Sequence, residues 1–151
     1  MSLLGQRITV IGAGIGGLAA AQILAQRGAS VTVLEQAEAI REVGAGLQVS
    51  PNGAAVVDAL GLGAQLRAAS VRGQAVSMRD YKSAGAEIAR LDLTRLREQE
   101  YFFTHRADLI AMLAQGARDC GVQIRLLQKV SAVADASGTD PARVEMANGD
   151  H

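Results

Sequence analysis

Two kinds of apolar run alternate along the first part of the chain. Residues 8–11 form a short β-branched run, which is typical of a strand buried in a parallel sheet. Residues 15–27 predict a helix because apolar residues recur there near helical spacing, and Gly28 is expected to end it. Residues 30–35, "SVTVLE", predict a second buried strand. Together the three segments predict one βαβ unit with a right-handed crossover.

The middle of the chain has shorter segments. Ser50 followed by a proline predicts a helix start, and the helix is expected to cover residues 51–60 and to stop at Gly61. Residues 74–81 and 87–93 predict two paired strands joined by the turn "KSAG". A small antiparallel β element is therefore expected in addition to the parallel strands.

The last part of the chain predicts a further helix followed by strands. Residues 106–120 have a clear apolar face and predict a helix that ends at Gly121. Residues 122–127 predict a third buried strand, and residues 130–134 and 143–146 predict two more.

The chain ends on a turn signal. Asn148-Gly149 is typical of a two-residue hairpin turn in which both central residues have positive φ. Such a turn needs a returning strand, and only Asp150 and His151 follow. We therefore expect residues 143–146 to form an exposed edge or a frayed end.

Composition narrows the classes of partner. Of the 151 residues, 49% are hydrophobic and 20% are charged, as in an ordinary globular domain. Basic and acidic residues number 15 each, so we expect neither a nucleic acid nor a membrane as partner. Cys120 is the single cysteine, which excludes a disulfide within the chain and favours the cytoplasm. No cluster of Cys, His and acidic residues has metal-site spacing.

A glycine-rich segment separates the first strand from the first helix. Gly12, Gly14 and Gly17 form the pattern G-x-G-x-x-G, and Glu35 ends the second strand about 20 residues later. Gly12 would permit a tight turn, Gly14 would let a pyrophosphate approach, and Gly17 would let the helix pack closely. The helix N-terminus attracts phosphate, and Glu35 can accept hydrogen bonds from a ribose diol. The pattern therefore predicts a binding site for a dinucleotide, either NAD or FAD. The alternative is a glycine-rich turn in another α/β protein that binds no dinucleotide.

Three separated stretches carry a family resemblance. They are "ITVIGAGIGGLAAAQILAQRGASVTVLEQ", "REVGAGLQVSPNGAAVVDALGL" and "THRADLIAML". In this order they resemble the flavin-dependent aromatic hydroxylases of the salicylate and hydroxybenzoate hydroxylase type, over nearly the whole chain. The resemblance implies an α/β fold in which residues 1–151 form a truncated, Rossmann-like βαβ FAD-binding domain with a parallel sheet and a small antiparallel element. Strands at about 73–93 would lead toward a substrate domain that is otherwise absent.

The same resemblance implies cofactor contacts. The pyrophosphate would meet the glycine-rich loop, the adenosine ribose would meet Glu35, and the adenine would meet the backbone of Val130. The segment from Arg41 to Gln48 would pass near the ribityl chain and the flavin ring, and Arg106 would contact the ribityl–phosphate region. The predicted cofactor-binding residues are Gly12, Ala13, Gly14, Gly17, Glu35, Gln36, Arg41, Gly46, Gln48, Arg106 and Val130.

Arg106 has support from its position as well. It stands at the start of a predicted helix, where a cation is unfavourable against the helix dipole by about 0.3–1 kcal/mol. A bound phosphate would explain this placement; the alternatives are a solvated arginine or a salt bridge to Asp108 or Glu35. The neighbouring His105 has no carboxylate or nucleophile at suggestive spacing, so we interpret it as structural.

The implied activity belongs to a longer protein. Family members hold FAD and use NAD(P)H and O₂ to hydroxylate a small aromatic substrate, and a homodimer is one assembly we consider. Because the family continues well past the point where this chain ends, we expect the chain alone to bind FAD weakly or not at all and to be inactive. Two hypotheses stay open beside this one: a stand-alone NAD-binding module or short dehydrogenase, and a non-catalytic fragment that assembles through its open sheet edge.

Overall fold

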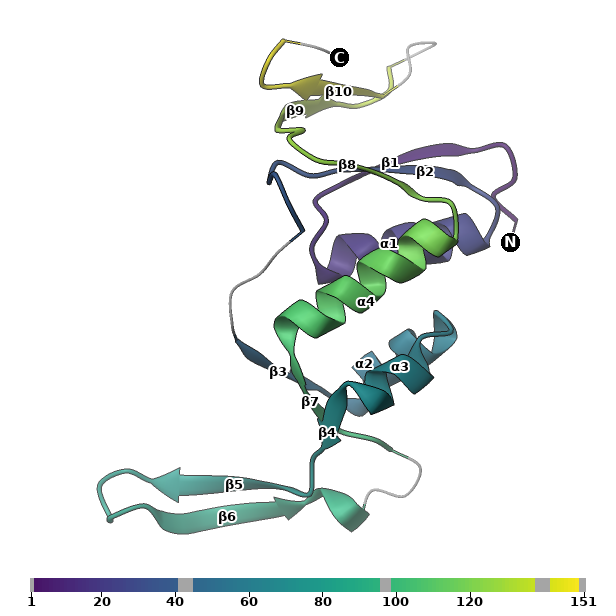
Figure 1. Cartoon of the computed structure of the whole chain (residues 1–151). Helices are drawn as coiled ribbons and strands as arrows, with labels where there is room; N and C mark the ends of the chain where they lie inside the picture. Colours follow the sequence, from purple (N-terminus) through teal and green to yellow (C-terminus); the bar gives the residue numbers. More distant parts are fainter. Residues whose placement is uncertain (1, 41–44, 96–98, 138–141, 150–151) are drawn as a thin grey trace. The chain divides into compact units, whose positions relative to one another are not determined.

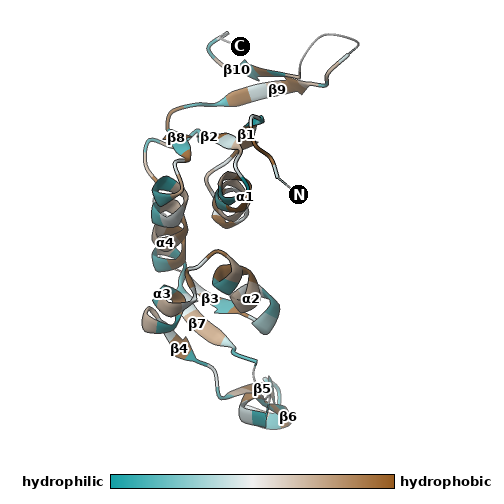
Figure 2. Cartoon of the chain, turned by 90° about the vertical axis from the view of Figure 1, so that its right-hand side faces the viewer, coloured by the Kyte–Doolittle hydropathy of each residue, from teal (hydrophilic) through white to brown (hydrophobic). Residues whose placement is uncertain are grey.

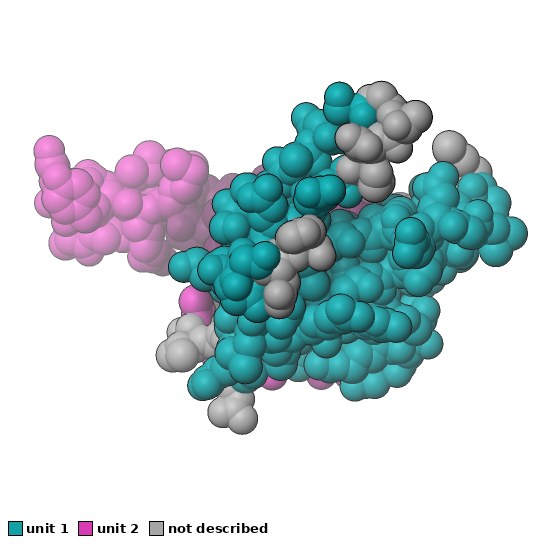
Figure 3. All heavy atoms as spheres, turned by 90° about the horizontal axis from the view of Figure 1, so that it is seen from above, with its two compact units in different colours: residues 1–42, 110–151 teal, residues 43–109 magenta. Residues whose placement is uncertain are grey.

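The computed structural model describes residues 2–40, 45–95, 99–137 and 142–149. Figure 1 shows the helices and strands of the chain, and Figure 3 shows the two compact units into which the chain divides. Unit 1 comprises residues 1–42 and 110–151, and unit 2 comprises residues 43–109. The division falls inside helix α4 (Arg106–Asp119), whose first residues belong to unit 2.

Unit 1 contains a parallel sheet of three strands. β1 (Arg7–Ile11), β2 (Ser30–Leu34) and β8 (Gln123–Arg125) lie in the order β1-β2-β8. Helix α1 (Ile15–Gln26) connects β1 to the parallel strand β2, so the predicted βαβ unit is confirmed. The predicted third strand is confirmed as β8. β1 and β8 are the edge strands of this sheet and contain only half-buried and exposed residues, so the prediction that these two strands are buried is wrong.

Apolar residues of the sheet and of two helices are buried in unit 1. Val33 of β2 stands in register with Val10 of β1 and Ile124 of β8. Val33 is fully buried, as are Leu18 of α1 and Leu113 of α4. Figure 2 shows brown and teal residues together on α4, which fits a helix that buries one face only.

The last two strands pair with each other. β9 (Val130–Ala134) and β10 (Arg143–Met146) are antiparallel, so the final strand has an upstream partner and the expectation of a frayed end is wrong. The expected exposed edge is confirmed, because β10 pairs with β9 alone among the described strands and alternate residues of β10 are exposed. The turn after β10 also differs from the expectation: Gly149 has φ +89°, whereas Asn148 does not have a positive φ. The Gly149 N–H donates to the Met146 carbonyl, so one left-handed glycine is sufficient for this turn.

Unit 2 contains an antiparallel sheet that the sequence patterns did not predict. β3 (Gly46–Val49), β7 (Phe102–His105) and β4 (Ser70–Arg72) lie in the order β3-β7-β4. Each strand is short, and β3 finds its partner far along the chain, where Gly46 pairs with His105. Short runs of this kind have little periodicity of their own, which is why local patterns do not reveal them.

Two helices accompany this sheet in unit 2. α2 (Pro51–Ala59) confirms the predicted helix, and α3 (Gly63–Ala68) follows it unpredicted. Ser50 has the extended backbone of an N-cap, but its side chain makes no capping bond. Its hydroxyl donates instead to Asn52 Oδ1 at 2.5 Å.

The predicted hairpin of unit 2 is confirmed. β5 (Ala75–Asp80) and β6 (Ala86–Asp92) are antiparallel neighbours, followed by a short 3₁₀ turn, η1 (Leu93–Arg95). Ala84 and Gly85 in the connecting turn both have positive φ, as in a type I′ turn. With its parallel sheet and antiparallel elements, the fold is α/β as predicted.

Within the described ranges, no helix is long and apolar enough to cross a bilayer. The same ranges contain no group of three His, Cys, Asp or Glu side chains placed to hold a metal ion. Cys120 is half-buried and unbridged.

Candidate dinucleotide-binding site

The carboxyl ends of β1 and β2 form one edge of the parallel sheet, where ligands bind in folds of this kind. Gly12 follows β1 and has φ +97°, a backbone conformation that side chains with a Cβ rarely adopt. The Gly12 N–H donates to the Leu34 carbonyl at 2.8 Å, which ties the loop to the end of β2. Gly14 is the N-cap of α1, so the loop leads directly into a helix N-terminus.

Gly17 and Gly14 have different structural roles. A Cβ on Gly17 would lie 2.0 Å from the Gly12 carbonyl oxygen and 3.5 Å from Val10 Cγ1, so α1 packs against the loop and β1 at this point. A Cβ on Gly14 would meet no heavy atom within 4 Å. Gly17 therefore serves packing, whereas the space beside Gly14 is open to a ligand.

The Glu35 carboxylate binds the backbone of two loops at this edge. Oε2 accepts a hydrogen bond from the Ala13 N–H at 2.7 Å, and Oε1 accepts one from the Ala37 N–H at 2.8 Å. The Ala13 bond and then the Ala37 bond lower the pKa of Glu35, with a smaller contribution from the backbone of Gln36, while burial acts in the opposite direction. A carboxylate oxygen has more than one lone pair, so both oxygens can still accept from a ribose diol.

A cavity of about 220 Å³ opens beside this carboxylate. It is lined by Ala13, Gly14, Glu35, Ala37, Ala39, Ile40 and Ile110. Of these lining residues, Glu35 alone has a charged side chain, and most of the others are small. A ligand in the cavity can therefore reach backbone groups and one carboxylate, as the phosphate and ribose of a nucleotide require.

Two further predicted residues belong to the same unit. Gln36 is exposed directly after Glu35, and Val130 is half-buried at the start of β9. The Gln128 N–H donates to the Glu35 carbonyl at 2.8 Å, so the segment just before Val130 is bonded to the end of β2. Sequence patterns do not reveal this bond or the Glu35–Ala13 bond, since both join residues far apart in the chain.

The other predicted residues belong to unit 2 or lie outside the described ranges. Gly46 and Gln48 are exposed on β3, and Gln48 Oε1 accepts a hydrogen bond from the Tyr101 hydroxyl at 2.5 Å. Arg106 is half-buried at the start of α4, while Arg41 lies outside the described residues. The structure describes each unit by itself, so a joint contact of these residues with one cofactor stays a prediction.

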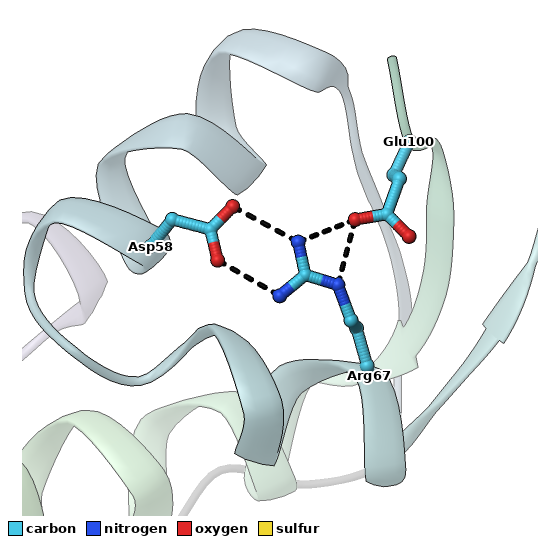
Figure 4. A network of polar contacts seen from close by, with 3 residues as sticks. All are labelled: Asp58, Arg67 and Glu100. Atoms are coloured by element: carbon cyan, nitrogen blue, oxygen red, sulfur yellow. Dashed lines mark hydrogen bonds and ion pairs between the residues drawn. The ribbon is translucent and has the colours of Figure 1, made fainter. Parts of the chain in front are cut away.

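A charged network in unit 2 was not predicted from the sequence. The Arg67 guanidinium donates to both carboxylate oxygens of Asp58, at 2.8 and 3.0 Å, and its Nε donates to Glu100 Oε2 at 2.7 Å (Figure 4). These bonds raise the pKa of Arg67 and lower the pKa of Asp58. Gly63 leaves room for the pair, because a Cβ there would lie 1.7 Å from Asp58 Oδ1. Because both carboxylates are bound to Arg67, we interpret this network as one that stabilises the fold of unit 2 and not as a ligand site.

The glycine turn after β1, the open space at Gly14 and the acidic end of β2 define a Rossmann-type dinucleotide-binding unit. Comparison with known proteins identifies the family to which this unit belongs. A family model described as "FAD binding domain" matches residues 6–151, and the chain belongs to this family.

Two of the similar proteins are, by name, a monooxygenase and a hydroxylase of hydroxybenzoates. The chain is 44% identical over 107 residues to 3-amino-4-hydroxybenzoate 2-monooxygenase of Streptomyces cremeus, covering 68% of this chain and 27% of that protein. It is 41% identical over 118 residues to 3-hydroxybenzoate 6-hydroxylase of Polaromonas naphthalenivorans (strain CJ2), covering 76% of this chain and 29% of that protein. Among solved structures, tetrameric 2-methyl-3-hydroxypyridine-5-carboxylic acid oxygenase matches with a TM-score of 0.82 at 26% identity, covering 96% of this chain and 36% of that one. The chain thus spans 27% to 36% of the length of these proteins.

Proposed function

We propose that this chain binds FAD and is the cofactor-binding part of a flavin-dependent monooxygenase that hydroxylates a small aromatic substrate with NAD(P)H and O₂. The observation that carries the proposal is the loop from Gly12 to Gly14, bound by the Glu35 carboxylate at the carboxyl edge of the parallel sheet. The family match supports FAD over the NAD-binding alternative, and the substrates named for the relatives support an aromatic acid as substrate class.

The residues of unit 1 would hold the adenosine diphosphate half of the cofactor. The pyrophosphate would approach the backbone at Gly14 and the N-terminus of α1, where no Cβ stands in the way. Glu35 would accept from both hydroxyls of the ribose while it keeps its bonds to the loops. Its negative charge disfavours a 2′-phosphate on that ribose. The adenine would meet the backbone of Val130.

The residues of unit 2 would meet the flavin half. Gly46 and Gln48 would lie near the ribityl chain and the ring, and Arg106 would neutralise phosphate charge. Arg41, which belongs to unit 1, would also meet the flavin half. The hairpin of β5 and β6 would lead toward the substrate domain of the whole protein.

Bound FAD would supply the redox chemistry, taking reducing equivalents from NAD(P)H and delivering them to O₂. The residues named above would bind and orient the cofactor, and none of them is given a proton-transfer role.

For the whole protein we propose a homodimer, which sedimentation of the full-length enzyme tests.

The cofactor proposal is tested by titrating the 151-residue chain with FAD and following the flavin fluorescence. We expect the chain alone to bind FAD weakly at most, and Gly14→Ala to abolish this binding, because its Cβ fills the space that the pyrophosphate would take. Gly16→Ala is the matched control, since its added Cβ also meets no heavy atom within 4 Å but lies inside α1. Circular dichroism should show that both variants fold. Equal FAD affinity of Gly14→Ala and the parent would refute the assigned phosphate site.

A further inference from the structure

The end of β2 holds the glycine loop through two consecutive N–H groups of the loop. The Gly12 N–H donates to the Leu34 carbonyl at 2.8 Å, and the Ala13 N–H donates to Glu35 Oε2 at 2.7 Å. The first bond joins two backbone groups, so any residue at position 34 could supply the acceptor. The second bond uses a carboxylate, so it depends on the side chain at position 35.

Glu35 is itself held in place on several sides. Its N–H donates to the Arg125 carbonyl of β8 at 2.9 Å, and its carbonyl accepts from the Gln128 N–H at 2.8 Å. The second carboxylate oxygen, Oε1, accepts from the Ala37 N–H at 2.8 Å. Because the backbone and both carboxylate oxygens are bonded, the side chain has a fixed position from which it can support the loop.

The loop needs this support because Ala13 is buried. Ala13 is 5% exposed, so water cannot readily replace the carboxylate as acceptor for its N–H. A buried N–H without an acceptor is unfavourable, so the loop would shift to bond it elsewhere. Gly14, the next residue, is the N-cap of α1. A shift at Ala13 would therefore move the N–H groups at the start of the helix, where a phosphate would lie.

We propose that Glu35 is a positioning residue for the phosphate: by binding the Ala13 N–H, its carboxylate fixes the glycine loop in the form that receives the pyrophosphate. The inference rests on the proposed function, which places the pyrophosphate at this loop and gives Glu35 contact with the ribose. The added role acts on a part of the ligand that Glu35 does not touch. Binding of the phosphate and binding of the ribose then depend on the same side chain.

A ligand that has phosphate but no ribose separates this role from two others. If Glu35 contacted the ribose and did nothing else, its replacement would leave pyrophosphate affinity unchanged. If its charge were decisive, replacement would raise pyrophosphate affinity, because the carboxylate and the pyrophosphate repel each other as anions. If Glu35 positions the loop, replacement lowers pyrophosphate affinity although the repulsion is removed. The three roles thus differ in the sign of one measured change.

The test titrates the 151-residue chain with inorganic pyrophosphate in the absence of metal ions and follows the amide NMR shifts of residues 14–17. Glu35→Gln keeps one acceptor oxygen for two N–H groups, and Glu35→Ala keeps none. We expect pyrophosphate affinity to fall about twofold to fivefold in Glu35→Gln and about tenfold in Glu35→Ala. The amide spectrum shows whether each variant is folded. If Glu35→Ala does not fold, the nearly isosteric Glu35→Gln decides the test.

Glu38→Gln is the matched control. It removes the same charge from an exposed position three residues further along the same segment. Its pyrophosphate affinity should equal that of the parent or exceed it. In the free chain, hydrogen exchange at the Ala13 amide should be faster in both Glu35 variants and unchanged in Glu38→Gln, which links the loss of affinity to the Ala13 bond.

Three results would overturn the proposal. Equal or tighter pyrophosphate binding by folded Glu35→Gln, beside a parent chain that binds, would refute the positioning role and leave the proposed function intact. The same loss of affinity in Glu38→Gln as in Glu35→Gln would show that the loss does not come from the Ala13 bond. If the folded parent chain does not bind pyrophosphate at all, the assigned phosphate site fails, and this inference fails with it.

Discussion

Gly17→Ala should destabilise the chain through a single steric contact. The new Cβ would lie 2.0 Å from the Gly12 carbonyl oxygen and 3.2 Å from its carbon. Ordinary carbon–oxygen contacts begin at about 3.3 Å, so the start of α1 has to move away from the loop. The obstacle is backbone at the end of a paired strand, so it cannot rotate aside as a side chain would.

The magnitude follows from two opposing contributions. Overpacking typically costs about 1–3 kcal/mol, and a backbone obstacle places this site toward the upper end. Alanine gains up to about 1 kcal/mol over glycine within a helix. Gly16→Ala receives the same helical gain without a clash, since its Cβ meets nothing within 4 Å. The difference between the two variants therefore isolates the cost of the contact.

We expect Gly17→Ala to be about 2–3 kcal/mol less stable than Gly16→Ala. That difference corresponds to a Tm lower by roughly 4–12 °C for a chain of this size. Urea and thermal unfolding followed by circular dichroism measure both quantities on the parent and the two variants. Equal midpoints for Gly16→Ala and Gly17→Ala would refute the reasoning, because they would mean that α1 does not pack closely on the Gly12 turn.

Two further predictions concern charged groups. The Ala13 N–H lowers the pKa of Glu35, so its stabilising contribution is complete above the ordinary glutamate pKa of about 4.3 and is lost as the pH falls through the lowered value of the folded chain. Urea unfolding at several pH values should show an acid sensitivity that Glu35→Gln lacks, and identical slopes would contradict the assignment. Gly63→Ala would place a Cβ 1.7 Å from Asp58 Oδ1 and turn that carboxylate away from Arg67. The stability of the parent should then fall with added salt more than that of the variant, whereas the same salt dependence in both would show that the pair contributes nothing measurable.

The sequence by itself determined the elements whose signal is local. The strand, glycine turn, helix and second strand of the βαβ unit follow from apolar periodicity and from G-x-G-x-x-G, and the structure confirms them. The helix α4 and the β5–β6 hairpin were predicted for the same reason, since each repeats its pattern over several residues or carries its own turn. Glu35 could be named because its place at the end of a strand is itself part of a pattern.

Tertiary structure alone decided the features that depend on partners distant in the chain. The strands β3, β4 and β7 are too short to carry a period and exist by pairing with one another. β10 finds its partner upstream in β9, although its turn signal pointed to a strand that would follow. The Glu35 carboxylate also accepts a hydrogen bond from the Ala13 N–H, and this bond forms only because the ends of β1 and β2 lie side by side. A hydrogen bond requires a donor and an acceptor within bonding distance. For residues 13 and 35 that distance is set by the pairing of the strands in the folded sheet, so a local sequence pattern cannot predict the bond.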